Sequence, residues 1–520
     1  MNQPHPSTEA LPGLESLAAA PPSSPAPAGA GRPRVQPVDR SQLTWQRLDV
    51  ERLIEPEHPA RAIWELVGRL KLDGFYAPIE AVEGVAGRTP WDPRLLVSLW
   101  IYAYSRGISS AREIARRCTY EPAFQWLCGL GEINHHTLSD FRVDHDASLR
   151  ELFVQVLGVL SAEGWVSLER VMHDGTRIKA CAGADSFRRE GRLQEHLEAA
   201  RQQVEAMGDP RQEEPSRKGA AQERALRERK QRLEQALEEV QKVREAKRED
   251  KEQARASESD PQARIMKQSD GGYAPSYNVQ LSTDAAHKII VGTGVTQSGS
   301  DYGQLIGAVA RVEANLGRKP CQVVVDGGFT TRENIMSMAE QRIDLVGSLA
   351  EVNQRIAGQK GKRGVSEAFY TDKFNYDEKE DVYLCPAGTV MKHHGRDFRL
   401  GVIFHQYRAP TGQCRACAFQ SQCCPGNVHH GRSVIRAERA PALQQFAQRM
   451  QTEEGKAIYR QRGAVAEFPN AWIKEKLGLR QFRLRGLAKV LLEVLWAAMT
   501  YNIQQWIRLS WRPGLGAANN

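Results

Sequence analysis

Between residues 50 and 160 the apolar side chains recur every three or four positions, which is the spacing of helices that bury one face. The pattern is clearest over Arg61–Leu70 and Arg94–Tyr104. Shorter helices are predicted over Ser109–Arg117, with Ser109 and Ser110 as N-cap candidates, and over Glu121–Leu127. The region 41–165 is therefore predicted to be an all-α N-terminal domain.

From Arg170 the pattern changes to short apolar runs that are typical of strands. Val171–Ile178 predicts one strand, and Tyr277–Leu281 with Lys288–Val295 predicts a hairpin. The next elements are predicted in turn: a helix over Asp301–Asn315 capped by Ser300, a strand over Gln322–Val325, a helix over Thr331–Gln341 with Thr330 and Glu333 as its capping box, and a strand over Ile343–Gly347. Strands followed by alternating helices and strands predict a mixed α/β sheet.

An insertion, 186–260, separates the first strand from the hairpin and is dominated by Glu, Arg, Lys, Gln and Ala. Leu226, Leu233 and Val240 repeat every seven residues, which predicts a coiled coil or a helical hairpin. Prolines between 209 and 216 predict the break between two arms. The alternative is a single solvated helix without a partner.

Composition sets wider limits on the class of protein. The chain has 520 residues and a formal net charge of +8, which predicts two to four structural units and suits a polyanionic partner. The first forty residues are rich in Pro, Ala and Ser and lack the pattern of a signal peptide, so 1–40 is predicted to be a disordered tail. No stretch reaches the roughly 18 apolar residues of a membrane span, and Val490–Ile503 carries Glu493. We therefore expect an intracellular protein without membrane contact.

Two aspartates, Asp174 and Asp326, occupy positions that indicate a functional role. Asp174 lies inside an otherwise apolar strand, where an unpaired carboxylate is costly to bury. Asp326 ends a strand before Gly327-Gly328, and ligands of open α/β sheets usually bind at such strand ends. Either aspartate taken alone is equally typical of a turn cap. Phosphodiester chemistry often uses two divalent ions about 4 Å apart, bridged by carboxylates, and Mg²⁺ prefers oxygen ligands.

Three groups of residues together resemble one family. They are His173-Asp174-Gly175-Thr176, Val325-Asp326-Gly327-Gly328-Phe329, and the late set Tyr459, Arg462, Glu467 and Lys474. These residues resemble bacterial insertion-sequence transposases of the DDE superfamily, and the resemblance runs from about Leu43 to Trp506. It implies a ribonuclease H-like catalytic core, and an enzyme that binds the ends of its own element and cleaves and transfers DNA strands.

The resemblance also implies roles for individual residues. Asp174, Asp326 and Glu467 would hold two Mg²⁺ or Mn²⁺ ions, Arg462 and Lys474 would contact phosphates, and Tyr459 would orient or stack near a terminal base. His173 points to the opposite face of its strand from Asp174, which favours a packed residue over a catalytic one.

Several glutamates are candidates for the third acid, because the segment from Arg462 to Glu467 contains one residue more than the commonest family signature. Glu453, Glu454 and Glu475 are the rivals. Glu467 is preferred because Lys474, seven residues later, lies within about 20° of it on a helix. Pro469 predicts that the helix starts or kinks near Glu467.

A cluster of cysteines follows the second acid. Cys414 and Cys417 form a C-x2-C pair, with Cys385 and Cys423 as outliers, and four thiolates can hold a structural Zn²⁺. The alternative is reduced thiols lining a small hydrophobic knot. His429 and His430 are candidates to replace one thiolate.

Beyond the last acid, the run Arg480–Gly486 is basic around a central Phe482, and Arg483 and Arg485 are candidate contacts to the DNA backbone. An ordinary surface loop is the alternative. The short helices near Thr137–Arg142 likewise fit either a helix-turn-helix reader of DNA or a bracing bundle.

The sequence thus predicts an α/β protein with a ribonuclease H-like mixed sheet core, an all-α N-terminal domain, a long helical or coiled-coil insertion and a small Cys-rich insertion. The predicted units are a tail (1–40), a helical DNA-binding domain (41–165), a first core part (166–185 and 261–350), the charged helical insertion (186–260), the Cys-rich insertion (351–450) and C-terminal helices completing the core (451–511). We expect double-stranded DNA as the partner, a homodimer on paired DNA ends, and a cytoplasmic, nucleoid-associated location. The alternatives are a DNA-binding regulator derived from a degenerate transposase, and a coiled-coil scaffold resting on 186–260 alone.

Overall fold

The computed structural model of the protein describes residue 40 and residues 47–81, 89–207, 217–247, 249–348, 364–399, 402–426, 430–437 and 441–512. The tail predicted over 1–40 lies outside the described residues apart from Arg40. None of the described helices is long and apolar enough to cross a membrane.

The region after Val50 consists of short helices, as the spacing of its apolar residues predicts. They are η2 (Val50–Leu53), α1 (Pro59–Gly68), α2 (Asp73–Tyr76), α3 (Pro93–Ser105), α4 (Ala111–Cys118), α5 (Pro122–Cys128), α6 (His135–Asp144) and α7 (Asp146–Ala162). Helix α3 is largely apolar and is buried from Leu95 to Tyr104, the behaviour of a core helix. Of the two cap candidates for α4, Ser110 accepts a hydrogen bond from the Glu113 amide.

The C-terminal helix α18 (Leu487–Leu509) joins this helical region to the sheet. It packs against α3, α7 and β6 (Ile290–Thr296), and the rings of Trp100 and Trp496 lie 6.3 Å apart between α3 and α18. Glu493 is fully buried in α18, where its Oε2 accepts the backbone N–H groups of Arg483 and Leu484. The N-terminal helices and α18 therefore share one apolar core.

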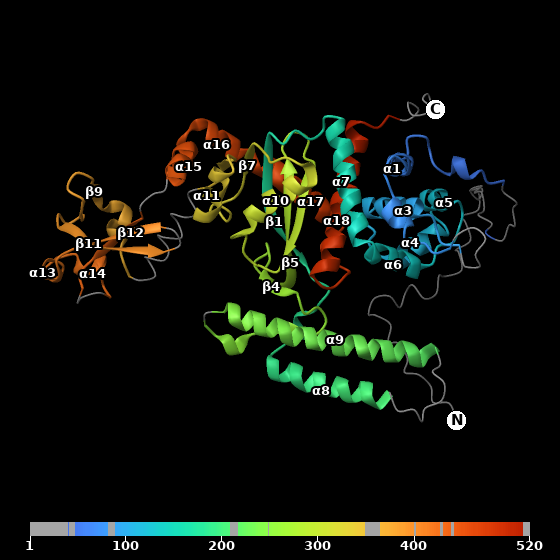
Figure 1. Ribbon diagram of the computed structural model, residues 1–520, viewed down its shortest axis with the longest axis horizontal. Coiled ribbons are helices and arrows are strands. Elements are labelled where there is room, and N and C mark those ends of the chain that lie inside the picture. Colours follow the sequence, from blue (N-terminus) through green and yellow to red (C-terminus); the bar gives the residue numbers. More distant parts are fainter. Residues whose placement is uncertain are drawn as a thin grey trace, which may run out of the picture. The chain divides into compact units, whose positions relative to one another are not determined.

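The central sheet has six strands, β1 (Arg170–Lys179), β4 (Arg264–Lys267), β5 (Tyr273–Asp284), β6, β7 (Gln322–Val324) and β8 (Asp344–Val346). Strand β5 pairs antiparallel with β1 along one edge, and with β4 and then β6 along the other. Strands β1, β7 and β8 run parallel, and α11 (Arg332–Glu340) joins β7 to β8 (Figure 1). This mixed α/β sheet, preceded by helices, confirms the predicted fold class at that level and is consistent with a ribonuclease H-like core.

The predicted starts of two helices were wrong. Helix α10 (Gln304–Leu316) begins after Gly303, whose φ of +74° suits a glycine, so Ser300 does not cap a helix and Asp301 lies in the preceding loop. Helix α11 is capped by Thr331, which accepts a hydrogen bond from the Asn334 amide. Thr330 instead donates its hydroxyl to backbone oxygens, those of Gly327 and Ser348.

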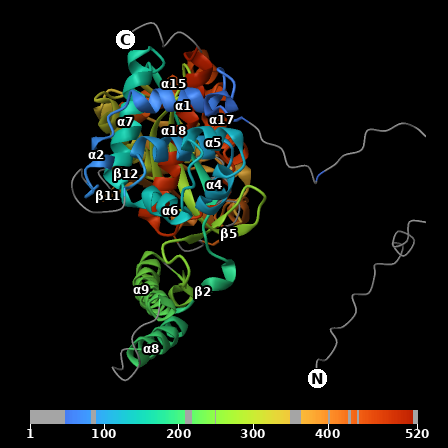
Figure 2. The ribbon, with the colours of Figure 1, turned by 90° about the vertical axis from the view of Figure 1, so that its right-hand side faces the viewer.

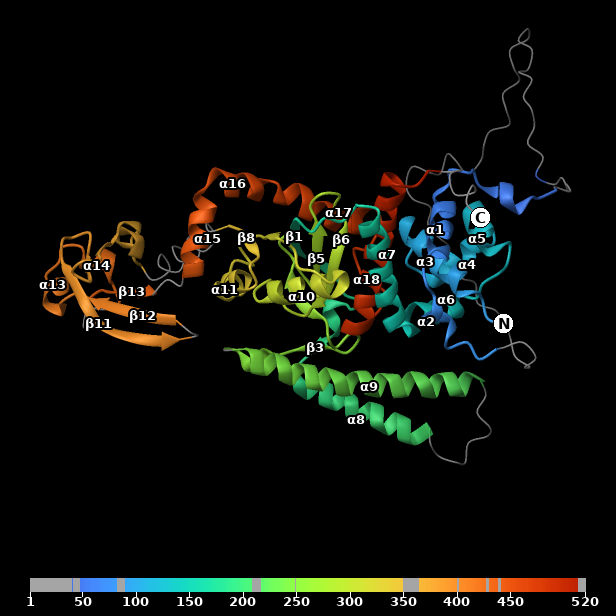
Figure 3. The same ribbon diagram turned by 45° about the horizontal axis from the view of Figure 1, so that its top comes forward.

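The charged insertion forms a helical hairpin of α8 (Glu190–Met207) and α9 (Arg217–Ala246), which lie side by side in Figures 1, 2 and 3. At its base are η3 (Ala184–Ser186), β2 (Phe187–Arg188), η4 (Lys251–Gln253) and β3 (Ala256–Ser257), with β2 and β3 paired. The heptad residues Leu233 and Val240 of α9 pack against Leu193 and Leu197 of α8. The single-helix alternative was therefore wrong, because α8 is the partner that the heptad pattern requires.

A second, antiparallel sheet carries the cysteines, in the order β13-β12-β11-β10-β9. Its elements are η5 (Glu367–Phe369), η6 (Thr371–Lys373), β9 (Asn375–Asp377), β10 (Val382–Leu384), β11 (Val390–Arg399), β12 (Val402–Arg408), α13 (Thr411–Arg415), α14 (Gln420–Cys423) and β13 (Ser433–Ala437). It has a small core of its own around Met391, Tyr407 and Val434.

The chain then returns to the central sheet through α15 (Pro441–Gln451), α16 (Glu453–Arg460), η7 (Gly463–Glu467) and α17 (Phe468–Glu475). Helix α15 packs against α11 and β8, with Phe446 in their shared core. The segment η7 packs against β1 and β5. These contacts place the C-terminal segment over one face of the sheet, where the candidate acids lie.

Candidate active site

Two parallel strands bring Asp174 and Asp326 to neighbouring positions. The register of β1 and β7 pairs Met172 with Val324. Asp174 lies two residues farther along β1, so its side chain points to the same face as Met172, and Asp326 lies two residues beyond the end of β7. Met172 and Val324 pack on that face against Val465 of η7. The two carboxyl groups therefore lie side by side on the face of the sheet that the C-terminal segment covers.

The Asp174 carboxyl is 16% exposed and has two polar neighbours. Asn470 donates its side-chain amide to Oδ2 at 3.0 Å, and Nη1 of Arg462 lies 3.8 Å from Oδ1. Burial raises the pKa of Asp174 to about 6; Arg462 opposes this shift, and the charges of Asp326 and Asp301 add to it. The ionised form is thus short of compensating positive charge.

Asp326 lies in a similar environment at the end of β7. Its Oδ1 accepts the Gly328 backbone N–H at 2.8 Å, which holds the turn after the strand. Burial raises the pKa of the Asp326 carboxyl above its usual value, while the Gly328 amide and Arg462 lower it. Two desolvated carboxylates that share one arginine form an electrostatic environment that favours a bound cation.

Glu467 ends a turn of π-helix, η7, that follows Arg462. A π-helix closes its hydrogen bonds over one residue more than an α-helix, so this turn takes up the extra residue between Arg462 and Glu467. Glu467 Oε1 then lies 3.8 Å from Nη2 of Arg462, and the guanidinium lies between Glu467 and Asp174. Pro469, in the first turn of α17, has no amide to close an α-helical bond back to Val465. The Glu467 side chain is 66% exposed.

The rival acids are engaged with other cations. Glu453 pairs with Lys456 at 2.8 Å, Glu454 pairs with Arg449 at 2.8 Å, and Glu475 pairs with Arg480. Glu467 is the acid among the four candidates that lies next to Arg462 and is thereby linked to Asp174.

Lys474 and Tyr459 lie close to the same face. Burial lowers the pKa of the half-buried Lys474 ammonium, Arg480 lowers it further, and Asp174 acts in the opposite direction, so Lys474 is within electrostatic range of Asp174. Tyr459 packs against the apolar cluster of Met172 and Val324. Both predicted DNA contacts are thus near the aspartate on β1.

His173 is a packed residue, as its strand position predicts. Its Nδ1 and Nε2 lie 2.9 Å from Ser282 Oγ and Gln280 Oε1, and its ring meets Phe329 edge to face at 4.9 Å. Burial lowers the pKa of His173 to about 4, so the imidazole is neutral near pH 7. Its place is structural, on the opposite face of β1 from Asp174.

Two polar residues of the site were missed by the sequence reasoning. Asn470 is 7% exposed, and while its amide binds Asp174, its Oδ1 has no hydrogen-bond partner among the described residues. Its position, three residues after Glu467 and so near it on a helix, was a usable signal. Asp301 accepts hydrogen bonds from Asn278 and Gln280 at 2.8 and 2.9 Å. Asp301 was missed because the sequence pattern placed it inside a helix capped by Ser300.

Asp301 packs on the His173 face of β1, because Gly175 has no side chain there. A Cβ at Gly175 would collide with Oδ1 of Asp301. The charge of Asp301 raises the pKa of both Asp174 and Asp326. Asp301 therefore influences the two aspartates through its charge, from the opposite face of β1 to Asp174.

The acids are near one another without forming a closed cage. Within the described parts of the chain, no three His, Cys, Asp or Glu side chains are arranged to hold a metal ion. Asp174 and Asp326 are neighbours, whereas Arg462 lies between Asp174 and the exposed Glu467. The chemistry of the donors, buried carboxylates with raised pKa values beside an unpaired amide oxygen, fits a divalent cation.

The cysteines gather at one side of the second sheet. The sulfur atoms of Cys385 and Cys414 accept backbone N–H groups from Thr389 and Arg432, at 3.2 and 3.4 Å. Burial raises the pKa of Cys423 to about 12, and the nearby thiols of Cys424, Cys414 and Cys385 contribute to the shift. Cys417 interacts electrostatically with Cys424. His429 lies outside the described residues.

The basic loop after α17 is tied to other elements by its arginines. Nε of Arg483 lies 3.3 Å from the Ser109 hydroxyl, and Nε of Arg485 donates to the Cys181 carbonyl at 3.2 Å. Both side chains are exposed.

Two family models match the chain. One is described as "Transposase domain (DUF772)" and covers residues 48–144. The other is described as "Transposase DDE domain" and covers residues 384–507. The chain is a transposase with a DDE domain. No curated protein and no solved structure matches it.

The two matches cover different parts of the transposase. The first coincides with most of the helical N-terminal region, η2 to α6. The second contains Glu467 and Arg462 and ends in α18, while Asp174 and Asp326 precede it in the chain. Because it carries a DDE domain, the transposase is a phosphoryl-transfer enzyme of DNA transposition, a class that binds DNA and generally uses divalent metal ions.

Proposed function

We propose that Asp174, Asp326 and Glu467 of this transposase hold two Mg²⁺ or Mn²⁺ ions, with which it cleaves and transfers the ends of its own element. The observation that supports the proposal is the parallel register of β1 and β7, in which Met172 pairs with Val324, two residues before Asp174 and Asp326, together with the position of Arg462 3.8 Å from Asp174. Once bound, the ions would supply an activated hydroxyl nucleophile and a stabilised leaving oxygen.

The protein's own residues orient the DNA at this site. Arg462 lies between Asp174 and Glu467, so it neutralises the acids and is placed to contact a phosphate that approaches them. Lys474 adds a positive charge near Asp174, and Tyr459 presents a ring beside the same face for stacking against a terminal base. Asn470 fixes the orientation of the Asp174 carboxyl.

The helical region 48–144 supports a role in reading the element's ends, because α4 packs against both α5 and α6 and carries Arg112, Arg116 and Arg117. A homodimer on paired DNA ends follows from the need to hold two ends at once. Zinc at Cys385, Cys414, Cys417 and Cys423 stays a prediction: N–H···S bonds to two of these sulfurs favour thiolates, whereas burial raises the pKa of Cys423 and the described cysteines form no group arranged to hold a metal ion.

The experiment that tests the proposed function is cleavage of DNA carrying the element's ends by the purified full chain. We expect strand cleavage in the presence of Mn²⁺ and none after chelation with EDTA. Protein that binds the same DNA and never cuts it, at any Mg²⁺ or Mn²⁺ concentration, would instead be a DNA-binding regulator.

Replacing Asn470 with leucine is expected to raise the Mn²⁺ concentration needed for half-maximal cleavage by roughly 10- to 100-fold, the usual effect of losing a partner that orients a metal ligand. Leucine keeps the branched shape of the side chain and removes the hydrogen bond to Asp174. Asn375→Leu, at an exposed position of β9, is the matched control. An unchanged Mn²⁺ requirement in Asn470→Leu would show that Asn470 does not act through Asp174.

A further inference from the structure

Helix α9 distributes its charges unevenly along its length. Its half toward the hairpin turn is basic, and its half toward the sheet is acidic. From 223 to 232 the charged residues are Glu223, Arg224, Arg227, Glu228, Arg229, Lys230 and Arg232, and from 233 to 246 they are Glu234, Glu238, Glu239, Lys242, Arg244 and Glu245. The hairpin thus presents its positive charge away from its base.

The hairpin does not need a second copy of the chain to bury its apolar seam. Leu233, Ala236 and Val240 of α9 are already buried against Leu193 and Leu197 of α8. The remaining faces of α9 are polar and charged. A partner that binds them should therefore itself be charged.

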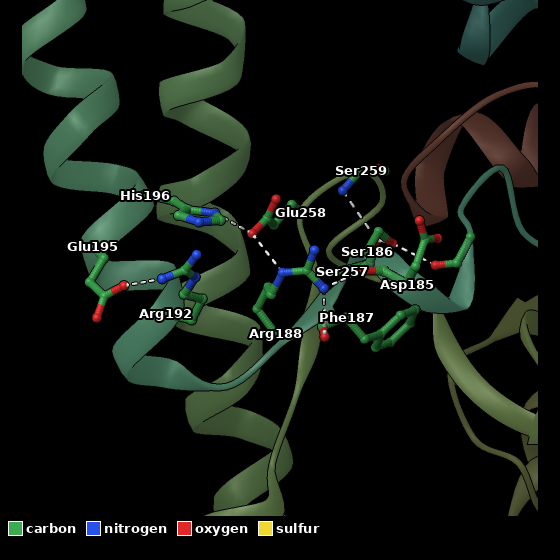
Figure 4. Close-up of polar contacts among 11 residues, drawn as sticks. Asp185, Ser186, Phe187, Arg188, Arg192, Glu195, His196, Ser257, Glu258 and Ser259 are labelled. Carbon is green, nitrogen blue, oxygen red and sulfur yellow. Dashed lines mark hydrogen bonds and ion pairs between the residues drawn. The ribbon is translucent and has the colours of Figure 1, made fainter.

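The base of the hairpin is fixed to the rest of the catalytic region. Figure 4 shows Glu258 accepting from His196, at 2.6 Å, and lying 3.5 Å from Arg188, beside the hydrogen bond between Ser186 and Ser257. Farther along α9, Glu239 is 2% exposed and pairs with Arg264 of β4. The ion pair of Glu239 with Arg264 therefore sets which face of α9 turns toward the sheet.

That face lines a groove with the basic loop at the start of α18. Gln231, Arg232 and Gln235 of α9 form one wall, and Arg485 and Lys489 contribute to the other, around a volume of about 560 Å³. The acids in the groove are Glu234 and Glu238, and Glu234 lies 3.7 Å from Arg201 of α8. Three cationic side chains from two separate elements therefore meet in one groove.

The same face continues as a row of arginines toward the hairpin turn. Arg227 and Arg224 lie four and seven residues before Gln231, which places both within about 40° of it around the helix. Both side chains are exposed, and Arg227 has an ion pair with Glu223 that is itself largely solvated. Arg229 is also exposed but points about 160° away from Gln231.

We propose that the groove between α9 and α18, together with Arg224 and Arg227, binds the phosphate backbone of double-stranded DNA held by the transposase. From Arg224 to Arg232 the helix rises about 12 Å, which spans three or four phosphates of one strand. Arg485 and Lys489 extend this row to the loop that follows the active-site helix α17. The hairpin is thereby a second, sequence-independent DNA contact outside the helical N-terminal region.

The test compares the full-length protein with its Arg224→Gln/Arg227→Gln double variant on a 40-base-pair duplex of arbitrary sequence, over a series of salt concentrations. Each phosphate contact contributes about 0.9 to the slope of log affinity against log salt, so the double variant should lower that slope by about 2. Arg229→Gln, on the opposite face, should leave the slope within its error, and Arg224→Lys/Arg227→Lys should retain most of it.

An unchanged slope in the glutamine double variant overturns the proposal, and so does an equal loss in Arg229→Gln, which would indicate unspecific attraction. A variant that changes the sedimentation of the free protein but not the slope would assign this face to self-association. Thermal unfolding checks that the variants are folded. The salt slope is measured in EDTA, where no cleavage is expected, so a failure of the catalytic proposal is separated from a failure of this one.

Discussion

Replacing Asp326 with asparagine is expected to reduce Mn²⁺-dependent cleavage of end-containing DNA by at least about 10³-fold, because a lost metal-holding carboxylate removes several kcal/mol of transition-state stabilisation. Asparagine keeps the acceptor for the Gly328 amide, so the turn after β7 should persist. DNA affinity and the unfolding temperature should stay close to those of the unmodified protein. Single-turnover cleavage at saturating protein is the measurement.

Asp270 offers a matched control for this change. Its Oδ1 accepts the amide two residues later, that of Gly272, at 2.9 Å, which is the same local bond that Asp326 makes, but it lies in an exposed turn. Asp270→Asn should therefore cleave normally. Equal cleavage by Asp326→Asn and Asp270→Asn would mean that Asp326 is a turn residue and not a ligand.

Glu467→Gln should produce a loss of the same order, about 10²- to 10³-fold in single-turnover cleavage, while Glu453→Gln, Glu454→Gln and Glu475→Gln each stay near full activity. The reason is geometric: Glu467 is the acid that adjoins Arg462 and through it Asp174, and its rivals pair with Lys456, Arg449 and Arg480. Cleavage of the same end-containing DNA measures all four variants.

The third-acid assignment would be wrong if one of the rival variants lost activity and Glu467→Gln kept it. The π-helical turn gives a further check, since deletion of one residue between Arg462 and Glu467 should convert it to an α-helical turn and keep the glutamate beside the arginine. That deletion is therefore expected to retain cleavage, unlike Glu467→Gln.

Asp174 and Asp326 could be identified from the sequence because each strand is predicted from the residues immediately around it. An apolar run with one carboxylate, and a run that ends in a carboxylate before two glycines, identify β1 and β7 without knowledge of their pairing. Their neighbouring positions depend on the parallel register, which the sequence does not contain. The helical hairpin of α8 and α9 was similarly predictable, because the apolar heptad residues of α9 pack against the adjacent helix α8.

The parts that sequence reasoning missed depend on backbone geometry and long-range contact. Ser300 has the chemistry of a cap, but Gly303 with its positive φ sets the start of α10, and this leaves Asp301 free to approach Gly175 and Gly328. Asn470 is an ordinary helix residue until α17 lies over β1 and brings it to Asp174. The extra residue before Glu467 counted against that acid in sequence, whereas the π-helical turn accommodates it.

Metal binding by the full-length protein on end-containing DNA tests the central claim most directly. Titration of Mn²⁺, followed by electron paramagnetic resonance of the free ion, should show two ions bound per catalytic site. Asp174→Asn, Asp326→Asn and Glu467→Gln should each weaken that binding by roughly 10-fold or more, and Glu454→Gln should not. Mn²⁺ binding that is unchanged in all three acid variants would contradict the account.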